Sequence, residues 1–122
     1  MKIEDLRIGN YYHFNGKIIK LDQSYFTAEM FYFIKHKQIR FTRITLNDKW
    51  FYRFGFKLCD LNRDYIFFYK ENSNHLYRHE FEVFKNRFGR KYAFFINVNF
   101  GYVDELQNMY YDINKKRLTC KL

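Results

Sequence analysis

The sequence predicts an α+β fold in which antiparallel strands outnumber helices. Aromatic residues make up 24% of the 122 residues and proline is absent, and aromatic side chains favour strands because they pack well on a pleated, half-buried surface. Short strand-like runs separated by turn residues occupy most of the chain, and only two stretches repeat apolar residues at helical spacing. A chain of this length is expected to form a single domain, residues 1–122, whose core needs no disulfide or metal.

The N-terminal third predicts a small antiparallel sheet that curls like part of a barrel. An entry turn over residues 3–10 is expected to place Leu6 and Ile8 in the core. Asn15 and Gly16 predict a tight hairpin, because both residue types tolerate the positive φ angles of a type I′ turn. The strands expected in this region cover residues 11–14, 17–21, 24–34 and 39–44.

A short helix is predicted within residues 45–56, which include the only tryptophan. Thr45 or Asn47 is suited to cap its first turn by accepting a backbone N–H, and Asp48 suits the positive end of the helix dipole. Gly55 is suited to leave the helix in a left-handed conformation. The apolar residues fall at helical spacing and are expected to plug a sheet: Leu46, Trp50, Phe51 and Phe54.

The C-terminal half predicts a second, meandering sheet and an amphipathic helix. The expected strands cover residues 57–61, 65–71, 75–84 and 92–100, with an edge strand over 118–122. The helix is predicted over residues 102–113, with Asp104 and Glu105 in its first turn, where the dipole favours acidic groups. Its apolar residues recur three and four positions apart and are expected to cover the second sheet: Val103, Leu106, Met109, Tyr110 and Ile113.

The formal net charge is +9, and all of the excess lies in residues 35–122, because residues 1–34 hold equal numbers of basic and acidic groups. We call three stretches that contain no acidic residue the basic windows. They comprise Lys35, Lys37, Arg40 and Arg43; Lys85, Arg87, Arg90 and Lys91; and Lys115, Lys116, Arg117 and Lys121. All except Lys121 are candidate binding residues. If they share one face they attract a polyanion or an acidic protein; the alternative is scattered charge that only aids solubility.

Tyrosines interleave with the basic windows, a combination that suits single-stranded nucleic acid because cations bind phosphates and rings stack on bases. These tyrosines are Tyr25, Tyr32, Tyr69, Tyr77 and Tyr92. The pattern is unspecific, and it leaves open a binding protein for RNA or single-stranded DNA. A metal-free nuclease that uses one histidine as base and another as acid also remains open, although no spacing selects a pair.

No motif for a metal, a cofactor or a covalent nucleophile is evident in the sequence. On a strand, His75 and His79 lie about 13 Å apart, too far to share one ion. Cys59 and Cys120 lack the density of a secreted disulfide scaffold, so we expect reduced thiols and a cytoplasmic location. Residues 1–5 turn polar at once, and no apolar run approaches the length of a membrane span.

Three segments, in the same order along the chain, resemble a family of small uncharacterised proteins from phages and prophages of Bacteroidetes. They are residues 5–10, residues 44–56 around Ile44, Leu46, Trp50, Phe54, Gly55 and Phe56, and residues 102–110. The chain departs from the family at Asp104, where a histidine is usual, and at Asn114 and Lys115, where a Thr-Gly turn is usual. The resemblance carries over no catalytic residue.

The chain is also similar in size and composition to anti-CRISPR proteins that inhibit the RNA-guided, RNA-cleaving effector of type VI-B systems, which occur in the same bacteria. This resemblance implies a non-enzymatic, phage-encoded inhibitor that binds the effector, its guide RNA or both. A basic aromatic surface suits either partner, because it can compete for RNA or dock on an acidic rim. No cofactor, small-molecule substrate or membrane is expected to take part.

Overall fold

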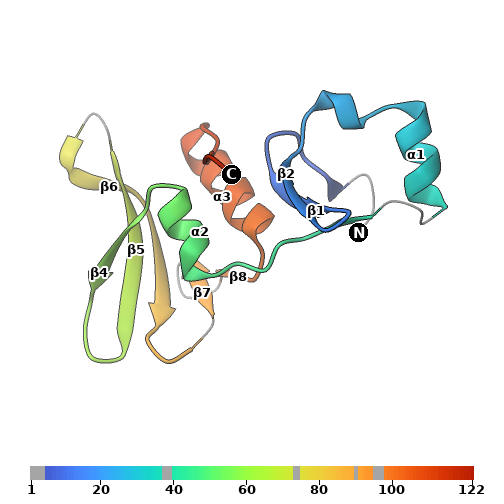
Figure 1. The fold of residues 1–122 in the computed structure, drawn as a ribbon. Helices are drawn as coiled ribbons and strands as arrows, with labels where there is room; N and C mark the ends of the chain where they lie inside the picture. Colours follow the sequence, from blue (N-terminus) through green and yellow to red (C-terminus); the bar gives the residue numbers. More distant parts are fainter. Residues whose placement is uncertain (1–4, 37–39, 73–74, 90, 95–97) are drawn as a thin grey trace.

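The computed structural model describes residues 5–36, 40–72, 75–89, 91–94 and 98–122. Within these ranges it contains a three-stranded and a five-stranded antiparallel sheet and three α-helices, so the strand-dominated α+β class is confirmed (Figure 1). Helix α3 (Val103–Asn114) lies between the two sheets and contacts both. Among the helices of the described ranges, none has the length and apolar character that crossing a bilayer requires.

The small sheet forms around the predicted hairpin. Strands β1 (Tyr11–Phe14) and β2 (Lys17–Lys20) pair antiparallel, and the turn between them places Asn15 at φ 48° and Gly16 at φ 82°. Strand β3 (Phe41–Thr42) pairs with the other edge of β1. Because β2 and β3 lie at opposite edges, the barrel-like closure is not confirmed.

Two further predictions for this region are wrong in detail. Leu6 is half-buried, but Ile8 is exposed, since the turn that ends at Gly9 directs it away from the core. The strand predicted over residues 39–44 shrinks to Phe41–Thr42 among the described residues. Residue 39 lies outside the described ranges.

The strand predicted over residues 24–34 is also wrong. The chain instead forms a 3₁₀ turn (Gln23–Tyr25) and helix α1 (Ala28–Lys35). The Thr27 side chain caps α1 by accepting a hydrogen bond from the Met30 amide at 3.1 Å. Cap and dipole charges favour the helix here, and they outweigh the strand preference of its aromatic residues.

The predicted central helix is confirmed as α2 (Asp48–Arg53). Asn47 is its cap, accepting from the Trp50 amide at 3.3 Å. The chain leaves the helix through Gly55, whose φ is 87°. All four residues of the predicted apolar stripe are buried: Leu46, Trp50, Phe51 and Phe54.

The second sheet is an antiparallel meander in the order β4-β5-β6-β7-β8, as predicted. Its strands are β4 (Lys57–Asp60), β5 (Tyr65–Asn72), β6 (His75–Asn86), β7 (Tyr92–Phe94) and β8 (Val98–Phe100). The single strand predicted over residues 92–100 is wrong, because β7 and β8 pair with each other and align Tyr92 with Phe100. This stretch contains no glycine or proline before residue 101 that signals the reversal.

The edge strand predicted over residues 118–122 does not form. The amide of Cys120 donates to the Tyr11 hydroxyl at 2.9 Å, and that hydroxyl donates to the Cys120 carbonyl oxygen at 3.0 Å. Leu118 is buried, and its carbonyl oxygen accepts from Gln107. Side chains thus supply the backbone partners that a neighbouring strand would otherwise provide.

One aromatic core joins these elements. Helices α2 and α3 lie over the same face of the five-stranded sheet, where Phe51 stacks on Phe68 with ring centroids 4.5 Å apart. Tyr11 of the small sheet reaches the same core and packs on Trp50. Both cysteines, Cys59 and Cys120, are free thiols.

Candidate functional site

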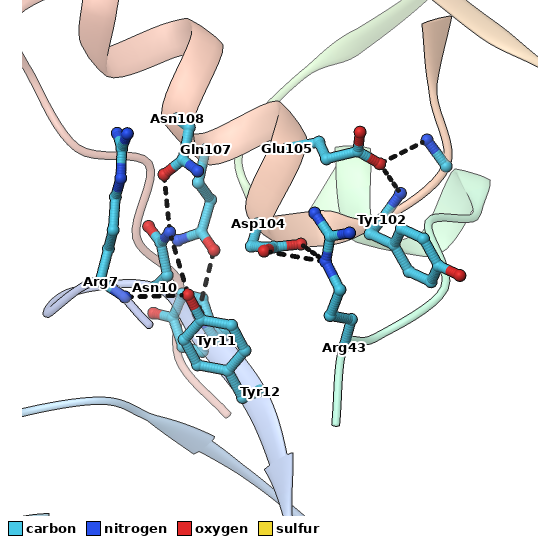
Figure 2. A network of polar contacts seen from close by, with 11 residues as sticks. Arg7, Asn10, Tyr11, Tyr12, Arg43, Tyr102, Asp104, Glu105, Gln107 and Asn108 are labelled. Atoms are coloured by element: carbon cyan, nitrogen blue, oxygen red, sulfur yellow. Dashed lines mark hydrogen bonds and ion pairs between the residues drawn. The ribbon is translucent and has the colours of Figure 1, made fainter. Parts of the chain in front are cut away.

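The buried polar side chains of the described residues gather at one place, the joint between α3 and the N-terminal segment (Figure 2). They are Asn10, Asp104 and Gln107, each exposed by 3% or less. Burying a polar group costs free energy unless it is hydrogen-bonded, so this concentration needs a matching set of partners. The network around them supplies these partners.

Gln107 ties three separate parts of the chain together with one amide group. Its Oε1 accepts from the Tyr11 amide at 3.0 Å, and its Nε2 donates to the carbonyl oxygens of Gly9 at 3.3 Å and Leu118 at 3.1 Å. These contacts hold the entrance to β1 and the segment after α3 against the middle of the helix. The residue therefore fixes one wall of the joint.

Asn10 and Tyr12 fix the neighbouring wall. The Asn10 Nδ2 donates to Asn108 Oδ1 at 2.8 Å, and the Arg7 amide donates to the Tyr12 hydroxyl at 3.1 Å. Burial raises the pKa of Tyr12, so its hydroxyl stays protonated at neutral pH. The backbone at Arg7 and the amide plane of Asn108 are thereby held in place (Figure 2).

Arg43 and Asp104 form the ionic part of the joint. The Arg43 Nε lies 3.1 Å from each carboxylate oxygen of Asp104, whose side chain is only 4% exposed. The Arg43 guanidinium also lies over the Tyr102 ring, 4.4 Å from its centroid. A carboxylate on one edge and an aromatic ring on one face together fix the plane of the guanidinium.

Hydrogen bonds also fix the start of α3, the helix that carries Asp104 and Asn108. The Glu105 carboxylate accepts from the amides of Gly101 at 3.1 Å and Tyr102 at 3.0 Å. The Val103 amide donates to the Ile44 carbonyl oxygen at 2.9 Å, which places the chain after Arg43 beside the helix. Arg43 therefore meets Asp104 although sixty-one positions separate them in sequence.

A pocket of about 720 Å³ opens over this network, and we call it the joint pocket. It is lined by Asp5, Arg7, Thr42, Arg43, Tyr102, Asp104 and Asn108. The lining comes from three stretches that are distant in sequence: the entry segment, the end of β3 and the first turns of α3. Its volume lies in the range of small-molecule sites, and polar side chains dominate it.

The joint pocket can recognise a polar ligand by hydrogen bonds and charge. Among the described lining residues there is no serine, cysteine, lysine or histidine. Among the described residues, no three His, Cys, Asp or Glu side chains gather as metal ligands. Of the described histidines, His13 lies on β1, His36 follows α1, and both His75 and His79 lie on β6. His79 contacts Glu82 at 2.7 Å and stacks on Tyr69.

A second surface lies at the end of the five-stranded sheet, where two turns meet side by side (Figure 1). We call it the tip: residues 61–65 between β4 and β5, and residues 86–89 after β6. Phe88 is 85% exposed there, more than any other large apolar side chain of the described residues, and two further exposed apolar residues lie on the adjacent turn, Leu61 and Tyr65.

Arg87 braces the tip. Its amide donates to the Asp64 carbonyl oxygen at 2.7 Å, and its Nη2 donates to Asp60 at 2.9 Å and to the Asn62 carbonyl oxygen at 3.1 Å. Asn86 closes the turn by accepting from the Phe88 amide at 3.0 Å. The Phe88 ring therefore projects from a backbone that is already fixed.

The structure places the three basic windows in three separate parts of the molecule (Figure 1). The first follows α1 and flanks β3, the second surrounds the tip, and the third follows α3. Lys37 and Arg90 lie outside the described residues. The other nine candidates are divided among these three parts.

Four of these candidates are engaged in ion pairs that serve the fold. Besides Arg43 with Asp104, they are Lys85 with Asp48, Arg87 with Asp60, and Lys116 with Glu80. Lys35, Arg40, Lys91 and Lys115 are exposed and form no ion pair with a described residue, whereas Arg117 lies over the Tyr111 ring. Of these open cations, Lys91 follows the tip and Lys35 ends α1.

Most residues of the joint pocket were not singled out as binding residues by sequence reasoning, which selected Arg43 alone. From the sequence, Asp104 is expected at the positive end of the helix dipole and as a departure from the family's usual histidine; its burial in the ion pair with Arg43 adds a further role. Residues 5–10, the start of the segment 44–56, and residues 102–110, on which the family resemblance depends, meet at this joint.

No family model, no curated protein and no solved structure matches this chain. The family resemblance noted from the three segments therefore stays a prediction. The tip and the joint pocket are the two surfaces of the described residues that suit a binding partner.

Proposed function

We propose that the chain is a non-enzymatic, phage-encoded inhibitor of host defence that binds an RNA-guided nuclease effector, its guide RNA or both. It acts in the cytoplasm of the bacterial host. The proposal takes its partner class from the resemblance to anti-CRISPR proteins, and its binding surface from the tip. The remaining open members of the basic windows would then add long-range attraction rather than a single contact patch.

The observation that supports docking is the presentation of Phe88. A nearly fully exposed aromatic ring on a braced turn has the character of an interface anchor, since such anchors lose little conformational freedom on binding. Lys91 and Arg63 are exposed near it and carry charge that suits an acidic rim or a phosphate backbone. The ring would fill an apolar pocket of the effector or stack on a base of its guide RNA.

A capture experiment tests this proposal. The tagged chain is incubated with a host lysate, with and without RNase, and bound protein and RNA are identified. We expect the effector to be retained after RNase, and Phe88→Ala to reduce its recovery at least about tenfold. The purified effector should also lose RNA cleavage when the parent protein is added.

Tyr32→Ala is the matched control, because Tyr32 is 57% exposed but lies on α1, in the part of the molecule opposite the tip. It should bind like the parent. Recovery of only mixed RNA that disappears on RNase treatment would contradict the inhibitor proposal. That result would favour the second candidate, a general module for RNA or single-stranded DNA.

The second candidate has an observation of its own. On α1 the exposed Tyr32 ring packs on His36, with centroids 4.3 Å apart, one turn from the open cation Lys35. A ring beside a cation suits base stacking with phosphate contact. This module would bind naked single strands with an affinity that falls steeply with salt, and Tyr32→Ala would weaken it.

A further inference from the structure

We infer that the joint pocket binds a nucleotide through its phosphate group, with Arg43 and Arg7 as the cationic contacts. This inference goes beyond the docking proposed for the tip, with which the pocket shares no residue. If the tip fails to bind a partner, nucleotide binding by the joint pocket is unaffected. If the joint pocket fails to bind a nucleotide, partner binding by the tip is equally unaffected. Arg43 is the arginine of the joint pocket that an ion pair with Asp104 holds in place.

One edge of the Arg43 guanidinium is held by Asp104, and the other edge faces the pocket. Its Nε atom alone contacts Asp104, so its two terminal amino groups donate to no described residue, and its side chain is 38% exposed on the pocket. The Tyr102 ring supports one face of the guanidinium (Figure 2). A pre-oriented pair of N–H donors is the geometry that binds two oxygens of a phosphate or carboxylate at once.

The other accessible groups of the lining are mostly donors too. Asn108 uses its Oδ1 to accept from Asn10, which leaves its NH₂ group as a donor toward the pocket. The Arg7 side chain and the Thr42 hydroxyl complete the set. The Asp104 carboxylate is almost fully covered and is matched by Arg43, so it does not face a ligand as a free charge.

The size of the pocket decides between a small anion and a larger ligand. A volume of about 720 Å³ exceeds what inorganic phosphate needs and falls within the range of pockets for drug-sized molecules. The free face of the Arg43 guanidinium and the 39% exposed Tyr102 offer flat surfaces against which a base can stack. A phosphate attached to a nucleoside uses both features.

A substitution of Asp5 is expected to raise the affinity for phosphate, the opposite of the effect expected at the arginines. It carries the exposed carboxylate among the described lining residues, and its charge opposes an anion in the pocket. Asp5→Asn should therefore strengthen phosphate binding, whereas loss of a cation should weaken it. A merely structural role for these residues would not produce a gain in affinity.

The experiment is a titration of the full chain followed by amide chemical shifts. The probes are adenosine 5′-monophosphate, adenosine, inorganic phosphate and a short single-stranded RNA. We expect the monophosphate to shift the amides of Arg43, Asp104 and Asn108 and to bind at least about tenfold more tightly than adenosine. Competition between RNA and the monophosphate would identify RNA as the source of the phosphate; its absence would identify the free nucleotide.

The variants are chosen so that the fold survives. Arg43→Lys keeps a cation beside Asp104 but loses the paired donors, and it should weaken binding about tenfold or more. Arg7→Gln removes a cation whose side chain supports no other described contact, and Lys49→Gln on α2 is the matched control. Equal binding of adenosine and the monophosphate, shifts confined to other residues, or unchanged affinity in both arginine variants would overturn the inference.

Discussion

Glu80 projects from β6 toward α3 and is only 9% exposed as a side chain. Burial opposes its ionisation, but hydrogen bonds from Lys116 and Tyr110 outweigh burial and hold the pKa of Glu80 below its ordinary value. Conversely, burial and the bond to Glu80 raise the pKa of Tyr110, so that hydroxyl stays protonated. These three side chains fasten the end of α3 to the sheet.

This arrangement predicts a pH dependence of stability. Because the folded-state pKa of Glu80 is lower than that of the unfolded chain, its contribution is present at neutral pH and is lost as the pH falls below the ordinary value of 4.5. Glu80→Gln should lower the free energy of unfolding by about 2 kcal/mol at pH 7 and flatten its decline toward pH 3. Urea unfolding of both proteins across this range gives the comparison. Parallel curves for parent and variant would show that Glu80 is not the group responsible.

Among the elements, α2 depends on how the chain leaves it. Gly55 has a φ of 87°, and a Cβ there would lie 3.2 Å from Lys70 Nζ, which donates to the Phe54 carbonyl oxygen at 2.6 Å. The glycine thus provides both the left-handed conformation and the room for Lys70. Phe56 then enters the core directly after the turn.

Gly55→Ala should destabilise the protein by about 1–2 kcal/mol, because a side chain in the left-handed region is strained. Gly101→Ala is the matched control, since a Cβ at Gly101 meets only Glu105 Oε1 at 3.7 Å, an ordinary contact, and its φ is not positive. Thermal unfolding measures both. A similar loss in the two variants would show that the positive φ is not what matters.

The elements that sequence reasoning found are those whose signals are local. The Asn15-Gly16 hairpin, the capped α2 and the amphipathic α3 each carry their determinants within a few residues. Helix α1 was missed because its aromatic residues favour strands, while the deciding cap at Thr27 is a single side chain. The reversal within residues 92–100 is not predicted from the sequence because neither glycine nor proline marks it.

Across the whole molecule, α3 is the common support of two sheets that contact each other little. The joint pocket, which this helix builds with the entry segment and β3, could not be predicted from local pattern, because each of its walls comes from a different part of the chain. The positions of the basic windows in the folded molecule could not be predicted from local sequence either. Sequence supplies their charge, whereas pairing with Asp48, Asp60 and Glu80 is a property of the tertiary fold.

Gln107 tests this supporting role. Gln107→Ala leaves the Tyr11 amide and the Gly9 and Leu118 carbonyl oxygens without their buried partner, so unfolding should cost at least about 2 kcal/mol less. Hydrogen exchange should accelerate at Tyr11 and its neighbours in β1 before it does in β5 and β6. Gln23→Ala, in the exposed 3₁₀ turn, should change neither quantity. Unaltered exchange at Tyr11 in Gln107→Ala would mean that the small sheet is held independently of this side chain.

The hydrogen bonds from Gln107 to Gly9 and Tyr11 also order events during synthesis on the ribosome. Residues 9–12 leave the exit tunnel long before residues 103–118. The nascent hairpin therefore lacks its hydrogen bonds to Gln107 until about a hundred further codons have been translated. During this interval the five-stranded meander, whose pairings are between neighbours in sequence, can already assemble. The N-terminal sheet is therefore expected to become resistant to protease last, although it is made first.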